Sequence, residues 1–182
     1  MTSLVFPTAA SVLLVLSLIV LGRRKPKYSH WVHTISELGE VGAPDEKLVS
    51  WFVFFPIGLL LLPISFQYHT PSPPIAALAG CVAIGYLVAA VCPCDPGSPV
   101  SGSTRQAIHN VGGGIEYVGG GLCLIWAAES IGSHFKWLGF LVLGAAMGLT
   151  VLPAASPRGL VQRLAEVCLF GSLIFLVTTS SV

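Results

Sequence analysis

Six long apolar runs are the feature of this 182-residue chain that most restricts its fold. Each run is close to the ~20 residues that an α-helix needs to cross the hydrocarbon core of a bilayer. The runs are continuous rather than alternating, which argues against a transmembrane β-barrel. The sequence therefore predicts an all-α, polytopic bundle that forms one transmembrane domain, with spans at about 4–21, 48–66, 75–91, 104–131, 135–152 and 158–178.

The composition agrees with a chain that lies mostly in lipid. Only 9% of the residues are charged and 54% are hydrophobic. A soluble domain carries about 25% charged residues, so little of this chain can face water. The net charge of +1 provides no basic face for neutralising phosphates, which argues against a nucleic-acid partner. The partner that the composition demands is the lipid bilayer.

The basic residues gather on one side of the predicted membrane. Eight of the nine lie between spans one and two, between spans three and four, or at the start of span six. Under the positive-inside rule that side is cytoplasmic, and both termini lie outside. Lys136 lies on the opposite side, and the eight are Arg23, Arg24, Lys25, Lys27, Lys47, Arg105, Arg158 and Arg163.

The longest connection contains a segment, Tyr28–Gly39, with helical periodicity. Its aromatic and aliphatic residues recur at helical spacing, and His30, His33 and Glu37 fall on another face. The glycine at its end stands where a helix stop is expected. We therefore predict an amphipathic helix over about 28–39 that lies at the cytoplasmic interface.

Ionisable residues fall inside two predicted spans, where a lipid-facing charge is costly. The fourth span carries His109 and Glu116, which share one helix face and lie about 10 Å apart along the axis. The sixth span carries Arg163 and Glu166, at a depth similar to that of His109. One interpretation makes these residues a catalytic or proton-relaying site. The alternative is that they make only structural hydrogen bonds and an internal ion pair.

Asp95 lies in the turn between the third and fourth spans. Turns favour Asp beside Pro and Gly for local backbone reasons alone. In the alternative interpretation, Asp95 folds over the mouth of the bundle and joins His33 and His109. Two imidazoles and a carboxylate form a ligand set suited to a divalent metal such as zinc. No HxxxH or HExxH spacing supports this metal site.

Two triple-glycine runs, Gly112–Gly114 and Gly119–Gly121, follow His109 in the fourth span. Small residues let transmembrane helices pack closely, which is the simpler interpretation of both runs. The other interpretation is that the missing side chains leave room for a lipid tail beside Glu116.

Several short motifs are distributed along most of the chain. Tyr28-Ser29 is followed by TISELG at Thr34–Gly39, Cys92–Asp95 reads CPCD, and Arg158–Arg163 reads RGLVQR. Together with His109 they resemble the integral membrane family known as domain of unknown function 998, whose corresponding motifs are ys…tiSdLG, FPxD, a following His and GxxxR. This sequence departs from them with Glu for Asp at position 37 and Cys for Phe at position 92.

The resemblance implies a bundle of six to seven helices in a bacterial or archaeal plasma membrane, and it implies no established activity. Three functions fit the polar residues. The first is an enzyme that binds or processes a lipid-like or amphipathic ligand at the cytoplasmic leaflet. The second is a proton-coupled small-molecule transporter, and the third is a non-catalytic subunit or assembly factor with membrane-protein partners. The candidate acid–base groups and metal ligands are Ser36, Glu37, Asp95, His109, Glu116, Arg163 and Glu166.

Overall fold

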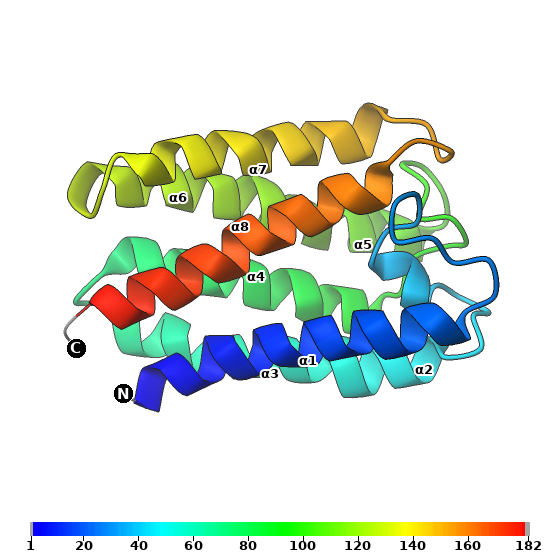
Figure 1. The fold of residues 1–182 in the computed structure, drawn as a ribbon, viewed down its shortest axis with the longest axis horizontal. Helices are drawn as coiled ribbons and strands as arrows, with labels where there is room; N and C mark the ends of the chain where they lie inside the picture. Colours follow the sequence, from blue (N-terminus) through cyan, green and yellow to red (C-terminus); the bar gives the residue numbers. More distant parts are fainter. Residues whose placement is uncertain (1, 181–182) are drawn as a thin grey trace.

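Six helical spans, each long and apolar enough to cross a bilayer, dominate the computed structural model, which describes residues 2–180 (Figure 1). No strand occurs in this part of the chain, so the predicted all-α membrane fold is confirmed. The spans are α1 (Thr2–Arg24); α2 (Glu46–Val49) continued by η2 (Ser50–Phe54) and α3 (Phe55–Tyr68); α4 (Pro73–Val91); α5 (Thr104–Gly114) continued by η3 (Ile115–Gly119) and α6 (Gly120–Ser130); α7 (His134–Val151); and α8 (Arg158–Thr179).

Local sequence explains several of these boundaries. Two prolines open α4, where their missing N–H groups need no helical partner. The Ser103 hydroxyl caps α5 by accepting a hydrogen bond from the Gln106 backbone N–H at 3.2 Å. Two spans contain a π-helical turn, η2 and η3, a deviation that is frequent at functional sites.

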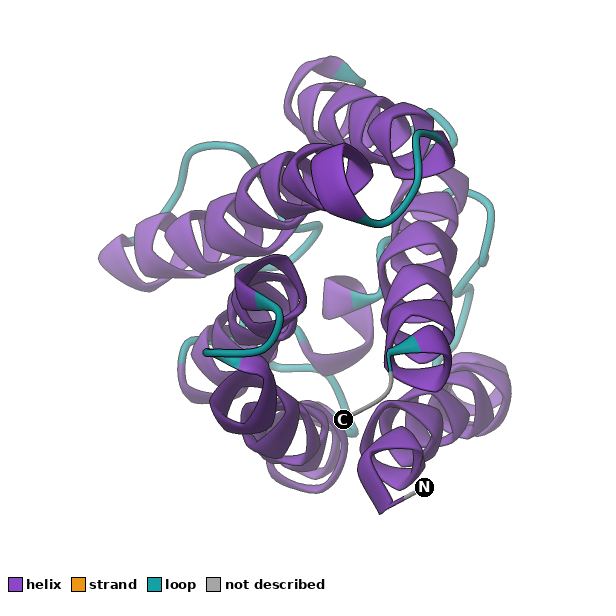
Figure 2. Ribbon diagram, turned by 90° about the vertical axis from the view of Figure 1, so that its left-hand side faces the viewer, coloured by secondary structure: helices purple, strands orange, loops and turns teal. Residues whose placement is uncertain are grey.

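The helix α4 lies in the middle of the bundle and packs against α3, α5, α6 and α8. Its inner residues, among them Leu78 and Val82, are completely buried. Figure 2 looks along the bundle from the end that carries both termini. On one side, α7 packs against α6, η3 and α8, whereas no comparably extensive contact joins α7 to α5.

The polar connections gather at one end of the bundle, opposite the termini (Figure 1). They comprise residues 25–45, 92–103 and 152–157. We call this the loop end. The eight basic residues that the positive-inside rule predicts to be cytoplasmic all lie in these connections or in the helical turns near them.

The amphipathic helix predicted over residues 28–39 is not formed. Only Ser36–Gly39 is helical, as the short 3-10 helix η1. The backbone before η1 forms hydrogen bonds with α8 instead. The N–H groups of Gly159 and Leu160, in the first turn of α8, donate to the carbonyl groups of Val32 and Trp31, both at 3.0 Å. Carbonyl groups used in this way are lost to an internal helix, so docking onto α8 replaces the predicted helix.

Candidate active site

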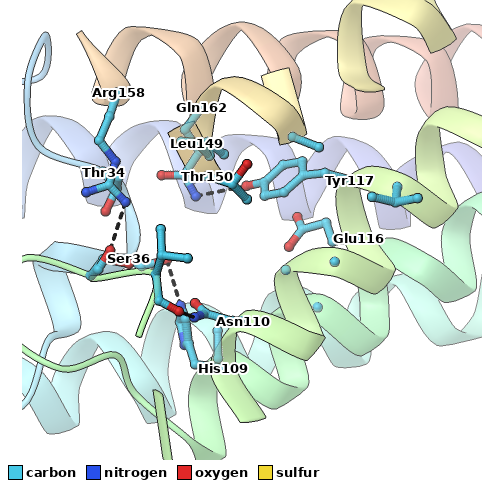
Figure 3. Close-up of a pocket in the computed structure, with 18 of the residues that line it drawn as sticks. Thr34, Ser36, His109, Asn110, Glu116, Tyr117, Leu149, Thr150, Arg158 and Gln162 are labelled. Carbon is cyan, nitrogen blue, oxygen red and sulfur yellow. Dashed lines mark hydrogen bonds between the residues drawn. The ribbon is translucent and has the colours of Figure 1, made fainter. Parts of the chain in front are cut away.

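A cavity of about 590 Å³ lies at the loop end, between α4, α5, η3, α7 and α8. Figure 3 shows polar side chains from four separate parts of the chain around this space. They are Thr34 and Ser36 from the first connection; His109, Asn110, Glu116 and Tyr117 from the fourth span; Thr150 from α7; and Arg158 and Gln162 from α8. The wall from α7 is otherwise apolar and includes Leu143, Ala146, Met147 and Leu149. The cavity is therefore amphipathic.

A capping box fixes the backbone that carries Ser36. The Glu37 carboxylate accepts hydrogen bonds from the backbone N–H and the hydroxyl of Thr34, at 2.8 and 3.1 Å. The Thr34 hydroxyl in turn accepts from the Glu37 backbone N–H at 3.3 Å. These reciprocal bonds are the ones that the pattern Thr-x-x-Glu provides at the start of a helical turn. Glu37 therefore acts within the loop, and Ser36 is left facing the cavity.

Contacts with α8 hold this loop against the bundle. The Ile35 backbone N–H donates to the Gln162 side chain at 2.6 Å. The Arg163 guanidinium donates to the carbonyl group of His33 at 3.0 Å and to the hydroxyl of Tyr28 at 2.7 Å. Burial raises the pKa of Tyr28 to about 12, although Arg163 acts in the opposite direction. The Tyr28 phenol thus stays neutral and donates its own proton to the carbonyl group of Thr34 at 2.9 Å.

Ser36 and His109 form a hydrogen-bonded pair on the cavity wall. The Nδ1 atom of His109 lies 2.8 Å from the carbonyl oxygen of Cys92, and the Nε2 atom lies 3.2 Å from the Ser36 hydroxyl. Because a carbonyl oxygen only accepts, Nδ1 carries the proton of the neutral ring, and Nε2 is left as an acceptor for the serine. This is the arrangement of a hydroxyl beside a base whose ring is oriented by a third group.

Arg158 is a buried cation beside this pair. Its side chain is 7% exposed and points from the first turn of α8 toward Thr34 and Ser36 (Figure 3). The guanidinium donates to the carbonyl groups of Gly97 and Ser98, at 3.3 and 2.8 Å, and Nε has no partner. Among residues 2–180, no carboxylate lies within ion-pairing distance of it.

A second group of polar side chains lies deeper in the membrane. Glu166 accepts hydrogen bonds from the hydroxyl groups of Tyr117 and Tyr86, at 2.6 and 3.1 Å. Glu116 Oε1 has no partner, and the residue lines the cavity while being 6% exposed. The cavity thus ends at an unsatisfied buried acceptor.

Two glycines leave space on the cavity wall. A Cβ atom added to Gly113 or Gly114 would meet nothing within 4 Å, and both residues line the cavity. Added to Gly112, it would lie 2.6 Å from the Val88 side chain. The first glycine run therefore packs through one residue and opens the cavity through the other two.

This chain matches the model of a known protein family. The family model described as "Protein of unknown function (DUF998)" matches residues 8–179. The chain belongs to this family. All the cavity residues, from Thr34 to Gln162, lie within the matched region. No curated protein and no solved structure matches the chain.

The structure of this DUF998 protein does not gather His33, Asp95 and His109 into a metal-binding group. No set of three or more His, Cys, Asp or Glu side chains in residues 2–180 is placed to hold a metal ion. His33 Nδ1 accepts from the Ser29 backbone N–H at 2.9 Å, and both ring nitrogens of His109 have protein partners. The predicted zinc-type site therefore lacks the geometry that it needs.

Asp95 closes its own loop instead of covering the cavity. Its carboxylate accepts from the backbone N–H and the hydroxyl of Ser103, at 2.7 and 2.8 Å, and from Arg105 at 3.2 Å. The bonds from Ser103, with a smaller effect of Arg105, lower the pKa of Asp95 below its ordinary value. Arg105 therefore pairs with Asp95 and does not line the cavity.

Arg163 and Glu166 do not form the ion pair that was one interpretation of their spacing. Arg163 bonds the docked loop, whereas Glu166 reaches η3 through Tyr117. Among the predicted residues, His109 and Glu116 both line the cavity, and Glu166 does not.

Arg158, Tyr117, Gln162 and Asn110 contribute to the site and were not among the residues predicted for it. Ser36 was named only within the wider set of candidate acid–base groups, not as the partner of His109. One sequence signal was available: Thr34-x-x-Glu37 has the capping-box spacing, which starts a short helical turn and fixes the backbone of the two residues between.

Proposed function

We propose that this DUF998 protein is a membrane hydrolase that cleaves an acyl ester or amide bond of a lipid-like substrate, with Ser36 as nucleophile and His109 as general base. The observation that carries the proposal is the hydrogen bond between Ser36 Oγ and His109 Nε2, 3.2 Å long, on the wall of the amphipathic cavity. A serine hydroxyl is a weak nucleophile until an oriented base takes its proton.

The chemistry follows from this pair in two balanced steps. His109 Nε2 takes the hydroxyl proton as Ser36 Oγ attacks the carbonyl carbon, and the tetrahedral intermediate expels the alcohol or amine, which leaves with that proton. Water then gives a proton to His109 and attacks the acyl-serine. The carboxylic acid is released and the serine hydroxyl is restored. The carbonyl group of Cys92 holds the imidazole in the required tautomer and stabilises the imidazolium at each step.

The walls of the cavity support a lipid-like substrate. Polar atoms line its loop end and its deeper end at Glu116, and its α7 wall is mostly apolar. Met147, on that wall, is 66% exposed at the outer surface of the bundle, where hydrocarbon surrounds a spanning helix. An acyl chain entering between α5 and α7 would contact the apolar side chains of α7, and its polar end would reach Ser36. With the loop end cytoplasmic, as the positive-inside rule predicts, the substrate comes from the cytoplasmic leaflet.

The test is hydrolysis of 4-methylumbelliferyl oleate in mixed micelles by the purified full-length protein. We expect measurable turnover by the wild type and a rate lower by roughly 10³-fold or more in Ser36→Ala and His109→Ala. The matched control is Ser172→Ala, since Ser172 is a buried serine of α8 outside the cavity. A Ser36→Ala rate equal to that of the control would contradict the proposal, as would a folded wild type without turnover.

Proton-coupled transport is the second candidate, because one observation favours it. Glu116 and Glu166 are both buried within spanning helices, and Glu166 accepts hydrogen bonds from two tyrosine hydroxyl groups. Buried carboxyl pairs of this kind are typical of proton relays. In proteoliposomes loaded with a pH-sensitive dye, substrate-driven acidification that Glu166→Gln abolishes and Ser36→Ala preserves would favour the transporter over the hydrolase.

A further inference from the structure

We propose that Arg158 binds the phosphate of the lipid substrate and so selects anionic headgroups, an inference that rests on the hydrolase function proposed above. The first observation is the burial of a cation without a counter-ion. Arg158 is 7% exposed, and among residues 2–180 no carboxylate lies within 4.0 Å of its guanidinium. A buried charge without an ionic partner is costly, and an anionic ligand would remove that cost.

The second observation is that the guanidinium is held in place while part of it stays free. The carbonyl groups of Gly97 and Ser98 accept from its two terminal nitrogens. Gly97 is itself fixed, because its backbone N–H donates to the Glu40 carboxylate at 2.7 Å. Arg158 Nε is buried and has no hydrogen-bond partner within the described part of the chain. The guanidinium is therefore oriented before any ligand arrives, with donor capacity left for one.

The third observation concerns depth. The apolar span of α8 begins at Arg158, so the guanidinium lies at the boundary between the hydrocarbon core and the loops. Lipid phosphates lie at that level, and the fork of N–H donors in arginine matches the oxygens of a phosphate. Ser36 lines the same cavity, where the acyl part of the lipid would lie. A glycerophospholipid with its phosphate on Arg158 would carry its ester groups toward Ser36.

The experiment is a calorimetric titration of the full-length Ser36→Ala protein in dodecyl maltoside, a variant chosen because it prevents turnover. The probes are dihexanoyl phosphatidic acid, dihexanoylglycerol and inorganic phosphate. We expect phosphatidic acid to bind at least roughly tenfold more tightly than dihexanoylglycerol, the difference that one charge-assisted interaction provides. Adding Arg158→Gln should abolish this preference. Adding Arg105→Gln instead should preserve it, because Arg105 pairs with Asp95 and does not line the cavity.

Equal affinity for the two lipids would overturn the proposal, and so would a preference that survives Arg158→Gln. Inorganic phosphate that binds as tightly as phosphatidic acid in an Arg158-dependent manner would contradict a lipid headgroup as the ligand. The ligand of Arg158 would then be free phosphate. The comparison of the two lipids needs no change at Arg158, and Arg158→Lys supplies a second variant if Arg158→Gln does not fold. Headgroup selection with no hydrolysis by the wild type would contradict the hydrolase alone, whereas hydrolysis without selection would contradict only the role of Arg158.

Discussion

The two glycine runs of the fourth span are identical in composition but differ in what their last two residues face. In the second run, a Cβ atom on Gly120 or Gly121 would lie 2.7 Å from Leu169 or 2.9 Å from Leu143. In the first run, Gly113 and Gly114 face open space. Within one continuous span, glycine therefore lets α6 pack closely against its neighbours and leaves space between α5 and the cavity.

The difference lies in what each run faces. Gly121 lies against Gly139 of α7, where a Cβ atom would meet backbone on the opposite helix, so α6 and α7 are in close contact. Between the two runs, the π-helical turn η3 carries Glu116 and Tyr117 toward the cavity and α8. The closed half stabilises the fold, and the open half is free for chemistry. The following predictions test this division.

The largest effect is expected at the closed half. Gly139→Leu places a Cβ atom 2.6 Å from the carbonyl oxygen of Gly121 and 3.1 Å from the backbone N of Ile125, and backbone atoms cannot rotate aside. We expect a loss of about 3 kcal/mol or more in the free energy of unfolding, because overpacking forces the two helices apart. Chemical denaturation in detergent measures it. Wild-type stability in this variant would contradict the close packing of α6 on α7.

The same substitution at the open half should damage activity and spare the fold. Gly114→Leu adds its side chain to empty space on the cavity wall, so we expect folding close to that of the wild type. Hydrolysis should fall by roughly a hundredfold, because the added side chain displaces the substrate from Ser36. Turnover of the micellar ester, measured together with the unfolding midpoint, gives both quantities. An active Gly114→Leu protein would show that substrate does not use this space.

A smaller effect is expected from the loop that presents Ser36. Thr34→Val preserves the shape of the side chain but removes two hydrogen bonds with Glu37. We expect a loss of about 1 kcal/mol in stability and a rate lower by roughly ten- to a hundredfold, since Ser36 is no longer held beside His109. The control is Thr178→Val, because the hydroxyl of Thr178 bonds only its own helix. Equal rates of hydrolysis in the two variants would contradict the claim that the capping box holds Ser36 beside His109.

The smallest effect is expected at Asp95, which lies outside the cavity. Its bonds to Ser103 and Arg105 hold the pKa of the carboxyl group below its ordinary value of 3.8. A lowered pKa adds stability above the ordinary value, and that contribution is lost as pH falls through the lowered one. We therefore expect Asp95→Asn to lower Tm slightly at pH 7, with hydrolysis unchanged, and the Tm difference from wild type to shrink below about pH 4. A difference independent of pH would contradict this origin.

The fold class was predictable because it follows from long apolar runs, which dictate spanning helices whatever their packing. His109 and Glu116, which the sequence places on one helix face, both line the cavity, and their role in a site stays a prediction. The contact of Ser36 with His109 joins residues 73 positions apart and depends on how the loop docks on α8, which periodicity does not report. The prediction of an interfacial helix was wrong for the same reason. Local spacing favoured a helix, but the carbonyl groups of Trp31 and Val32 accept hydrogen bonds from the first turn of α8. The glycine runs also needed the structure, because only the neighbouring helices distinguish them.

The most direct test of the central claim is covalent labelling with a long-chain alkyl fluorophosphonate, which forms a stable bond with an activated serine. The modified residue is identified by mass spectrometry of peptides from the purified protein. We predict an adduct on Ser36 that is lost in His109→Ala and reduced in Gly114→Leu. A folded wild type without an adduct on Ser36, or equal labelling of Ser36 in the absence of His109, would contradict the assignment of this pair as the reactive centre.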